Sequence, residues 1–179
     1  MTSHYIVSGP GRVGGHLVLG VLLSAGVTAT RTHDPDFSFG CDPDTVLILV
    51  DRRDRFAAIM SNCLVWHTGQ STDYKRSPEP FDVDPGQFDY LYYQHVNYYD
   101  RHDFNRPFAG VERLYFEDFV TDLDVIYARL HLPQIIEPNA RQDEITRLLH
   151  RPSPYKYTET IRNWQILQGR FRELQSMAL

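Results

Sequence analysis

The sequence predicts an α/β domain of three layers, in which a mostly parallel sheet is flanked by helices on both faces. Short apolar segments alternate along the chain with segments whose apolar residues recur at helical spacing. The most apolar segment, residues 45–50 (TVLILV), is continuous, as in central strands that are buried on both faces. Sheets of this class bind ligands beyond the carboxyl ends of their strands. Residues that follow the strands are therefore the first candidates for a site.

The first half of the chain predicts strands and helices in alternation. Residues 4–8 form a short strand candidate, and residues 14–25 after the glycine-rich turn suit a buried helix. A second strand is expected over residues 27–30 and a third over residues 45–50. A helix over residues 56–66 follows, because its apolar residues recur at helical spacing.

The second half begins with residues 68–86, which are rich in Pro, Asp, Ser and Gly and predict a long surface loop or lid. Residues 88–99 then carry six aromatic side chains in twelve positions. Helical spacing of aromatic residues favours core packing over the floor of an acceptor site, although the second interpretation stays open. The remaining expected elements are a strand over 110–116 and helices over 119–130, 139–150 and 158–175, the last two separated by Pro152 and Pro154.

Length and charge limit the domain count and the partners. A chain of 179 residues fits one domain over residues 1–179. A net charge of -5 argues against a nucleic-acid partner, so that any anion site must be local. We expect no membrane span and no signal segment. Cys41 and Cys63 lack metal-ligand spacing, which indicates two free thiols in a reducing, cytoplasmic compartment and no metal site.

Residues 8–17 (SGPGRVGGHL) connect the first predicted strand to the first predicted helix. Small residues let backbone N–H groups converge, and the helix start adds positive potential, so the segment suits an anion. Gly9 and Gly14 have the spacing of a P-loop, which favours a P-loop NTPase-like domain. Gly15 and His16, however, stand where a Lys and a Ser or Thr are required. The alternative is a glycine turn that packs the crossover and binds nothing.

Two other segments follow predicted strands. Arg53 comes directly after residues 45–50 and Ser61 follows two helical turns later, so both could face one phosphate. The alternative is a solvated turn before an amphipathic helix. His33 follows the second strand, and its ordinary pKa suits it to accept a proton near neutral pH. The alternative for His33 is a surface histidine without a function.

In this order the segments resemble the cofactor site of the cytosolic and bacterial sulfotransferases that use 3'-phosphoadenosine 5'-phosphosulfate (PAPS). Residues 10–17 resemble the 5'-phosphosulfate loop of that family, with Arg12 at its basic position. Residues 31–35 (RTHDP) are similar to its Lys-Thr-His-x-Pro segment, which implies that His33 is the general base. Arg53 and Ser61 match its 3'-phosphate pair in type and spacing.

Two later segments extend the resemblance. Residues 114–119 (LYFEDF) resemble the Tyr-Glu-Asp-Leu segment, with Phe116 where a Tyr near the adenine often sits. Residues 157–164 (YTETIRNW) are like the C-terminal stretch that ends in Asn-Trp. The chain departs from the family at Val13, Gly15 and His16, which lack the usual loop hydroxyls, and it has no clear counterpart of the C-terminal Arg-Lys-Gly segment.

The resemblance implies transfer of a sulfuryl group from PAPS to a hydroxyl or amine of a small-molecule or carbohydrate acceptor, without a metal. It assigns catalysis to His33 and Arg12. The missing hydroxyls favour an alternative, a nucleotide-binding module that transfers nothing. A P-loop small-molecule kinase, with Asp51 as a magnesium ligand, ranks last because the loop lacks Lys. The expected PAPS-binding residues are Pro10, Gly11, Arg12, Val13, Gly14, Gly15, His16, Leu17, Arg53, Ser61 and Phe116.

Overall fold

The computed structural model describes residues 4–34, 42–69, 79–100, 108–133 and 156–177. The chain divides into two compact units, which we call unit 1 (residues 1–53 and 98–152) and unit 2 (residues 54–97 and 153–179). The sheet lies wholly in unit 1, and the described part of unit 2 is mainly helical. A single domain over residues 1–179 stays a prediction.

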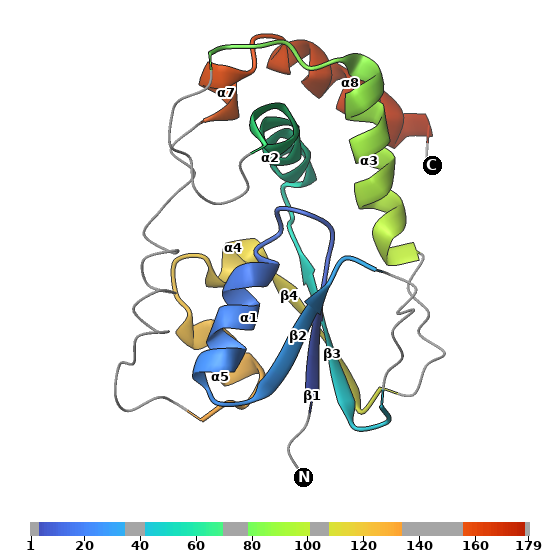
Figure 1. Cartoon of the computed structure of the whole chain (residues 1–179). Coiled ribbons are helices and arrows are strands. Elements are labelled where there is room, and N and C mark those ends of the chain that lie inside the picture. The colour runs from blue at the N-terminus through green and yellow to red at the C-terminus, as the bar shows by residue number, and fades with distance from the viewer. Residues whose placement is uncertain (1–3, 35–41, 70–78, 101–107, 134–155, 178–179) are drawn as a thin grey trace. The chain divides into compact units, whose positions relative to one another are not determined.

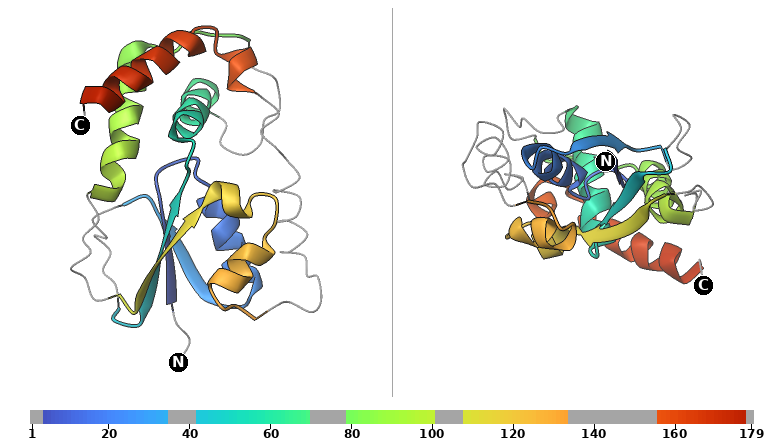
Figure 2. Two further views of the ribbon diagram at one scale, coloured as in Figure 1. Left: turned by 180° about the vertical axis from the view of Figure 1, so that it is seen from behind. Right: turned by 90° about the horizontal axis from the view of Figure 1, so that it is seen from below.

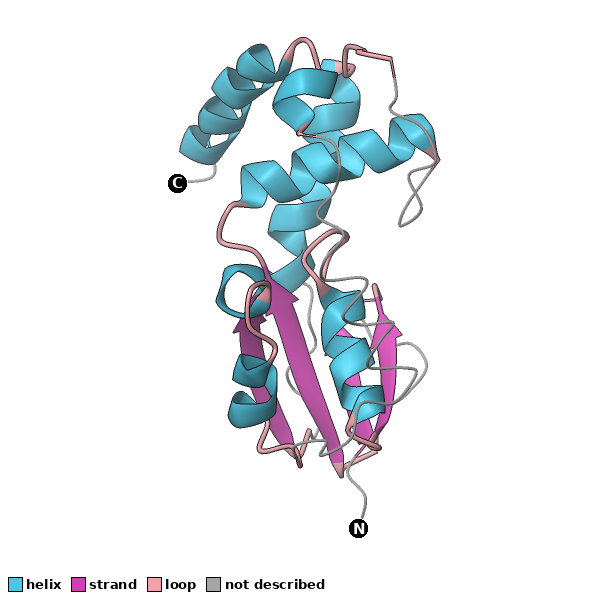
Figure 3. Cartoon of the chain, turned by 90° about the vertical axis from the view of Figure 1, so that its left-hand side faces the viewer, coloured by secondary structure: helices cyan, strands magenta, loops and turns pink. Residues whose placement is uncertain are grey.

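Unit 1 contains a parallel sheet of four described strands, and the prediction of an α/β fold is confirmed (Figure 1; Figure 3, magenta). The strand order is β2-β1-β3-β4. In the register, Ser8 is paired with Thr32 of β2 and Leu49 of β3, and Asp51 is paired with Tyr115 of β4. All four carboxyl ends therefore lie at one edge. The strands are β1 (His4–Ser8), β2 (Thr28–Thr32), β3 (Thr45–Asp51) and β4 (Gly110–Tyr115).

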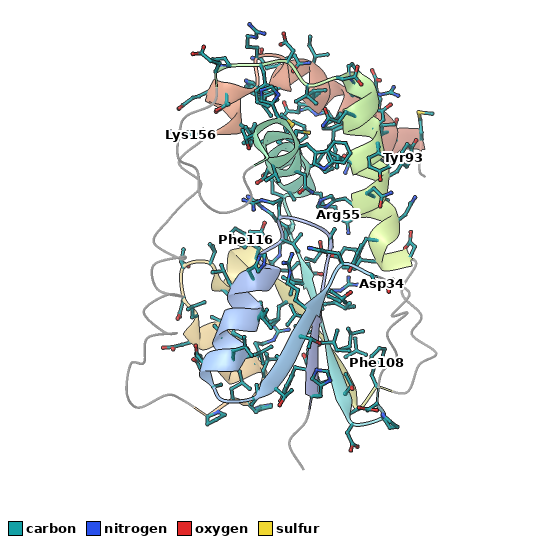
Figure 4. All side chains as sticks on the ribbon, viewed as in Figure 1. Asp34, Arg55, Tyr93, Phe108, Phe116 and Lys156 are labelled. Atoms are coloured by element: carbon teal, nitrogen blue, oxygen red, sulfur yellow. The ribbon has the colours of Figure 1, made fainter. Side chains whose placement is uncertain are left out.

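The central strands β1 and β3 are buried on both faces of this sheet. One face packs against α1 (Gly15–Ser24), α4 (Phe116–Phe119) and α5 (Asp124–Arg129), which lie together in Figures 1 and 2. The opposite face buries three residues of β1 and β3 and contacts Phe108, labelled in Figure 4. Double burial explains why residues 45–50 are continuously apolar. The arrangement is compatible with a three-layer P-loop-like domain. The buried residues facing α1, α4 and α5 are Val7, Ile48, Val50 and Leu114, and those on the other face are Ile6, Leu47 and Leu49.

Unit 2 has its own apolar core, formed by α2 (Arg55–Thr68), most of α3 (Pro85–Asp100), α7 (Tyr157–Thr160) and α8 (Trp164–Met177). Asp54 caps α2, since its carboxylate accepts the N–H of Ala57 at 2.9 Å. A parallel bridge joins Phe81 to Ile161. The buried residues of this core are Phe56, Ile59, Met60, Cys63, Leu64, Phe81, Val83, Phe88, Leu91, Tyr92, Ile161, Leu167 and Leu174.

Three sequence-based boundaries differ from the structure. Of the helix expected over residues 119–130, only α5 forms, and Phe119 instead ends α4; between them the Asp122 carboxylate accepts the N–H of Asp124 at 3.0 Å. The helix expected over residues 158–175 is divided into α7 and α8. Helix α3 begins at Pro85, inside the expected loop, as suits a proline in a first turn. The helix expected over residues 139–150 lies outside the described residues.

Candidate anion-binding site

The glycine loop, residues 9–14, connects β1 to α1 at the carboxyl edge of the sheet. A Cβ on Gly9 would lie 2.5 Å from the carbonyl oxygen of Val50, so the loop passes tightly over the end of β3. Gly14 has a φ of 90°, and its Cβ would lie 2.6 Å from Cδ2 of Phe116. Close packing therefore suffices to explain these two glycines. The side chains around the loop are what indicate a ligand.

The hydroxyl of Tyr98 is hydrogen-bonded to the first backbone N–H of the glycine loop. It accepts the N–H of Gly9 at 3.2 Å, and it is hydrogen-bonded to Oγ of Ser8 at 3.0 Å. Burial raises the pKa of Tyr98, so the phenol stays protonated at neutral pH. One potential anion-binding amide is thus already paired within unit 1.

Arg31, His16 and His33 form a group that we call the Arg–His cluster. The Nη1 of Arg31 lies 2.7 Å from Nε2 and 3.1 Å from Nδ1 of His16, and its Nη2 donates to Nε2 of His33. Nδ1 of His33 lies 2.7 Å from the Gly9 carbonyl, which can only accept, so Nδ1 carries the proton. The lone pair of His33 on Nε2 consequently faces the guanidinium of Arg31.

Gly15 leaves the space that the Arg31 side chain fills. A Cβ at Gly15 would lie 3.0 Å from Nε of Arg31. The strand register pairs Arg31 with Val7, one residue before the end of β1, which brings the guanidinium to the start of α1. The position where a P-loop would carry Lys is therefore empty of side chain, and a cation from β2 lies beside it.

In the Arg–His cluster, Arg31 is positively charged and both imidazole rings are neutral at pH 7. Partial burial, followed by Arg31, His33 and Arg12, lowers the pKa of His16. Partial burial and Arg31 also lower the pKa of His33, against an opposing effect of the Gly9 carbonyl. Among the described residues, Arg31 contacts no carboxylate. A partly buried charge without such a partner favours an anion as its guest.

A second charged group lies at the ends of β3 and β4. Arg53 donates to both carboxylate oxygens of Asp118 at 2.6 and 2.8 Å, and its backbone N–H donates to Glu117 at 3.1 Å. Its guanidinium also lies 4.4 Å from the ring centroid of Tyr115. This pairing lowers the pKa of Asp118 and raises that of Arg53. The arginine expected at the 3'-phosphate thus has a carboxylate partner in this structure.

The structure brings the other expected residues together only in part. Phe116 begins α4 beside Gly14 (Figure 4), and the Arg52 guanidinium lies 4.9 Å from its ring centroid. Ser61 lies on α2 in unit 2, whereas Arg53 belongs to unit 1, so the expected pair is divided between the units.

The remaining residues of the loop segment differ in exposure. Val13 is a core residue of unit 1, Pro10 is also buried, and His16 is exposed in the first turn of α1. Arg12 has a φ of 68°, which is uncommon for a residue other than glycine. Gly11, Gly14 and Leu17 are partly buried, and Gly15 is buried.

Sequence reasoning missed Tyr98, Glu117 and Asp118 as residues of this edge. The sequence could have indicated Glu117 and Asp118, because they follow β4 just as Arg52 and Arg53 follow β3. Neighbouring parallel strands end at the same edge, so the two pairs should lie close together. No local pattern indicates Tyr98, which is separated from Gly9 by 89 positions.

Comparison of the chain with family models, curated proteins and solved structures finds no match. Within the described residues, no group of three or more His, Cys, Asp or Glu side chains is placed to hold a metal ion. Of the helices in that same part of the chain, none has both the length and the apolar character needed to cross a bilayer.

Proposed function

We propose that the chain binds PAPS at the carboxyl edge of the sheet and transfers its sulfuryl group to a hydroxyl or amine. One observation carries the proposal: a neutral His33, oriented by the Gly9 carbonyl, lies beside a cationic Arg31 that contacts no described carboxylate. Transfer to a hydroxyl requires a base close to groups that stabilise negative charge, and this edge combines the two.

The residues at this edge fit an oxyanion at the end of a nucleotide. The sulfate end would be bound by Arg12, Arg31 and the start of α1. Arg12 would neutralise the charge that develops on the leaving oxygen. His33 would accept the proton of the acceptor at Nε2, while its bond to Gly9 holds the ring. PAPS, when bound, supplies the sulfuryl group. The chain itself contributes positioning, charge neutralisation and a proton acceptor.

A second candidate is a module that binds the nucleotide without transfer. Two observations favour it: Nε2 of His33 already faces the Arg31 guanidinium, and Val13, Gly15 and His16 carry no hydroxyl for the sulfate. In such a module the same cations would bind phosphate, and no proton would be transferred.

Calorimetric titration with adenosine 3',5'-bisphosphate tests the proposed donor site. We expect binding to the wild-type chain that is selective over ATP and is weakened by Arg53→Ala. Arg162→Ala is a matched control, because Arg162 is also exposed and also pairs with an aspartate, Asp82, at 3.1 Å. Failure of the wild-type chain to bind the bisphosphate, or equal weakening by both substitutions, would reject the site.

Turnover of PAPS with a panel of hydroxyl and amine acceptors separates the two candidates. A transferase should lose turnover on His33→Ala and still bind the bisphosphate, because His33 is assigned to the proton and not to the nucleotide. A binding module should bind the bisphosphate and show no turnover in either form.

A further inference from the structure

We propose that Arg31 is a receptor for a tetrahedral oxyanion and also masks His33, so that oxyanion binding releases the ring nitrogens of His16 and His33. The inference deepens the proposed function, and it rests on that function only for the identity of the oxyanion as the sulfate end of PAPS. The geometry of the Arg–His cluster supports the receptor by itself.

Arg31 contacts two histidine rings, and an oxyanion could replace both contacts. Its Nη1 donates to His16 at 2.7 Å and its Nη2 donates to His33, so two neutral rings accept from one guanidinium. An oxyanion carries a negative charge that a neutral imidazole lacks, and two of its oxygens can accept from the guanidinium fork together. A sulfate or phosphate at this edge would therefore compete with both imidazoles for Arg31.

When an oxyanion displaces these contacts, the ring nitrogens of the two histidines become available to accept protons. Nε2 of His33 is the nitrogen that carries the lone pair, and the Arg31 guanidinium donates to it. When the guanidinium turns to an oxyanion, that nitrogen is free to accept a proton. His33 then acts as a base only after the anion is bound, which would limit unproductive proton transfer before binding.

The charges around the cluster determine the direction of the accompanying proton change. Arg12 from the glycine loop and Arg31 from β2 oppose protonation of His16, and Arg31 opposes that of His33. Tyr98 at the end of α3 remains a neutral phenol, and the Asp34 carboxylate, labelled in Figure 4 beyond β2, acts on Tyr98. A bound dianion reverses this balance, so both rings should take up protons more readily.

Histidine pKa values measured by NMR test the inference on the full chain. Spectra of histidine-labelled protein would be recorded from pH 5 to 8 in sodium sulfate and in sodium chloride of equal ionic strength. Sulfate itself does not titrate in this range, so every proton taken up belongs to the protein. We expect the pKa values of His16 and His33, assigned by His→Gln substitution, to rise by about one pH unit in sulfate.

His4 is the internal control, because it lies at the opposite end of β1 and contacts Thr30 at 3.3 Å, away from the cluster. Its ring resonances should be the same in both salts. Unchanged pKa values of His16 and His33, or a response to sulfate at His4 equal to theirs, would overturn the inference.

Two substitutions of Arg31 separate the effect of its charge from the effect of its fork geometry. Arg31→Gln should raise the pKa of both rings in chloride, because a positive neighbour is removed, and should abolish the response to sulfate. Arg31→Lys keeps the charge without the fork and should keep a smaller response. A full response to sulfate in folded Arg31→Gln would also overturn the inference.

The same spectra with adenosine 3',5'-bisphosphate distinguish this inference from the proposed function. If sulfate raises both pKa values and the nucleotide does not bind, the oxyanion receptor stands and the PAPS proposal fails. If the nucleotide binds while both pKa values stay fixed, the PAPS site stands and the receptor role of Arg31 fails.

Discussion

Gly14 combines a left-handed backbone with a contact that leaves no space for a side chain. Its φ is 90°, and a Cβ would lie 2.6 Å from Phe116 and 3.0 Å from Phe119. Gly14→Ala should therefore lower the free energy of unfolding by about 3 kcal/mol, through backbone strain together with overpacking. Chemical denaturation followed by circular dichroism measures this loss.

Gly26 is the matched control for that substitution. Its φ is 76°, yet no described atom would lie within 4 Å of a Cβ at this position, so Gly26→Ala carries the backbone strain alone. We expect it to cost about 1 kcal/mol. Equal losses at the two positions would show that the contact with Phe116 has no energetic importance.

Asp118 holds the arginine that the proposed function assigns to the 3'-phosphate. Asp118→Asn keeps the shape of the side chain and removes the charge, so Arg53 should be released for the ligand. We expect a few-fold gain in affinity for adenosine 3',5'-bisphosphate by calorimetry. Asp82→Asn, which removes a carboxylate from the exposed pair with Arg162, is the control for net charge. A similar gain in the control would point to long-range electrostatics instead.

At the scale of elements, Asn163 joins two segments of unit 2 that are distant in the sequence. Its Oδ1 accepts the N–H of Val83 at 3.0 Å, and its Nδ2 donates to the Val83 carbonyl at 2.8 Å. Beside it, the N–H of Arg162 donates to the Phe81 carbonyl at 2.9 Å. The side chain thus continues the pairing that the Phe81–Ile161 bridge begins.

Substitution of Asn163 should loosen the attachment of α7 and α8 within unit 2. Asn163→Ala leaves both polar groups of Val83 without this partner and should cost about 2 kcal/mol in urea denaturation. Asn163→Asp should also destabilise, because a carboxylate would face the Val83 carbonyl. Asn97→Ala, at an exposed asparagine of α3, is the control and should change little. A loss no larger than that of Asn97→Ala would contradict the role given to Asn163.

At the scale of the whole molecule, local patterns predicted the elements and long-range pairing determined the site. Residues 45–50 indicated a central parallel strand, because double burial leaves a continuous apolar run. The start of α5 at residue 124 instead of residue 119 was missed, because no local pattern indicates the hydrogen bond of Asp122 with Asp124. The contact of Arg31 with His16 depends on the register of β1 and β2 and on the missing side chain of Gly15. Neither the register of these strands nor the space beside Gly15 can be predicted from periodicity in the sequence.

Stability of the chain should fall as the pH drops below the ordinary histidine value. The pKa values of His16 and His33 are lowered from 6.5 in the folded chain, so the unfolded chain binds more protons below that pH. Both side chains are partly exposed, and solvent screening limits the effect to a few tenths of a kcal/mol each. Denaturation at pH 7.5 and 5.5 should show the loss in wild type.

His16→Gln should reduce this pH dependence, whereas His4→Gln should leave it unchanged. The lowered pKa of Asp118 acts in a separate window, because its contribution is lost only as the pH falls below about 4. Greater stability of the wild-type chain at pH 5.5 than at pH 7.5 would reverse the sign and contradict the assignment of neutral imidazoles.

The pairing of Phe81 with Ile161 has a consequence for synthesis on the ribosome. The last described strand of the sheet is complete at residue 115, whereas the apolar core of unit 2 also needs Leu167 and Leu174 from the last described helix. A nascent chain that has not reached those residues exposes the apolar side chains of α2 and α3 without their cover. In that interval we expect the chain to need chaperones and to be prone to aggregate.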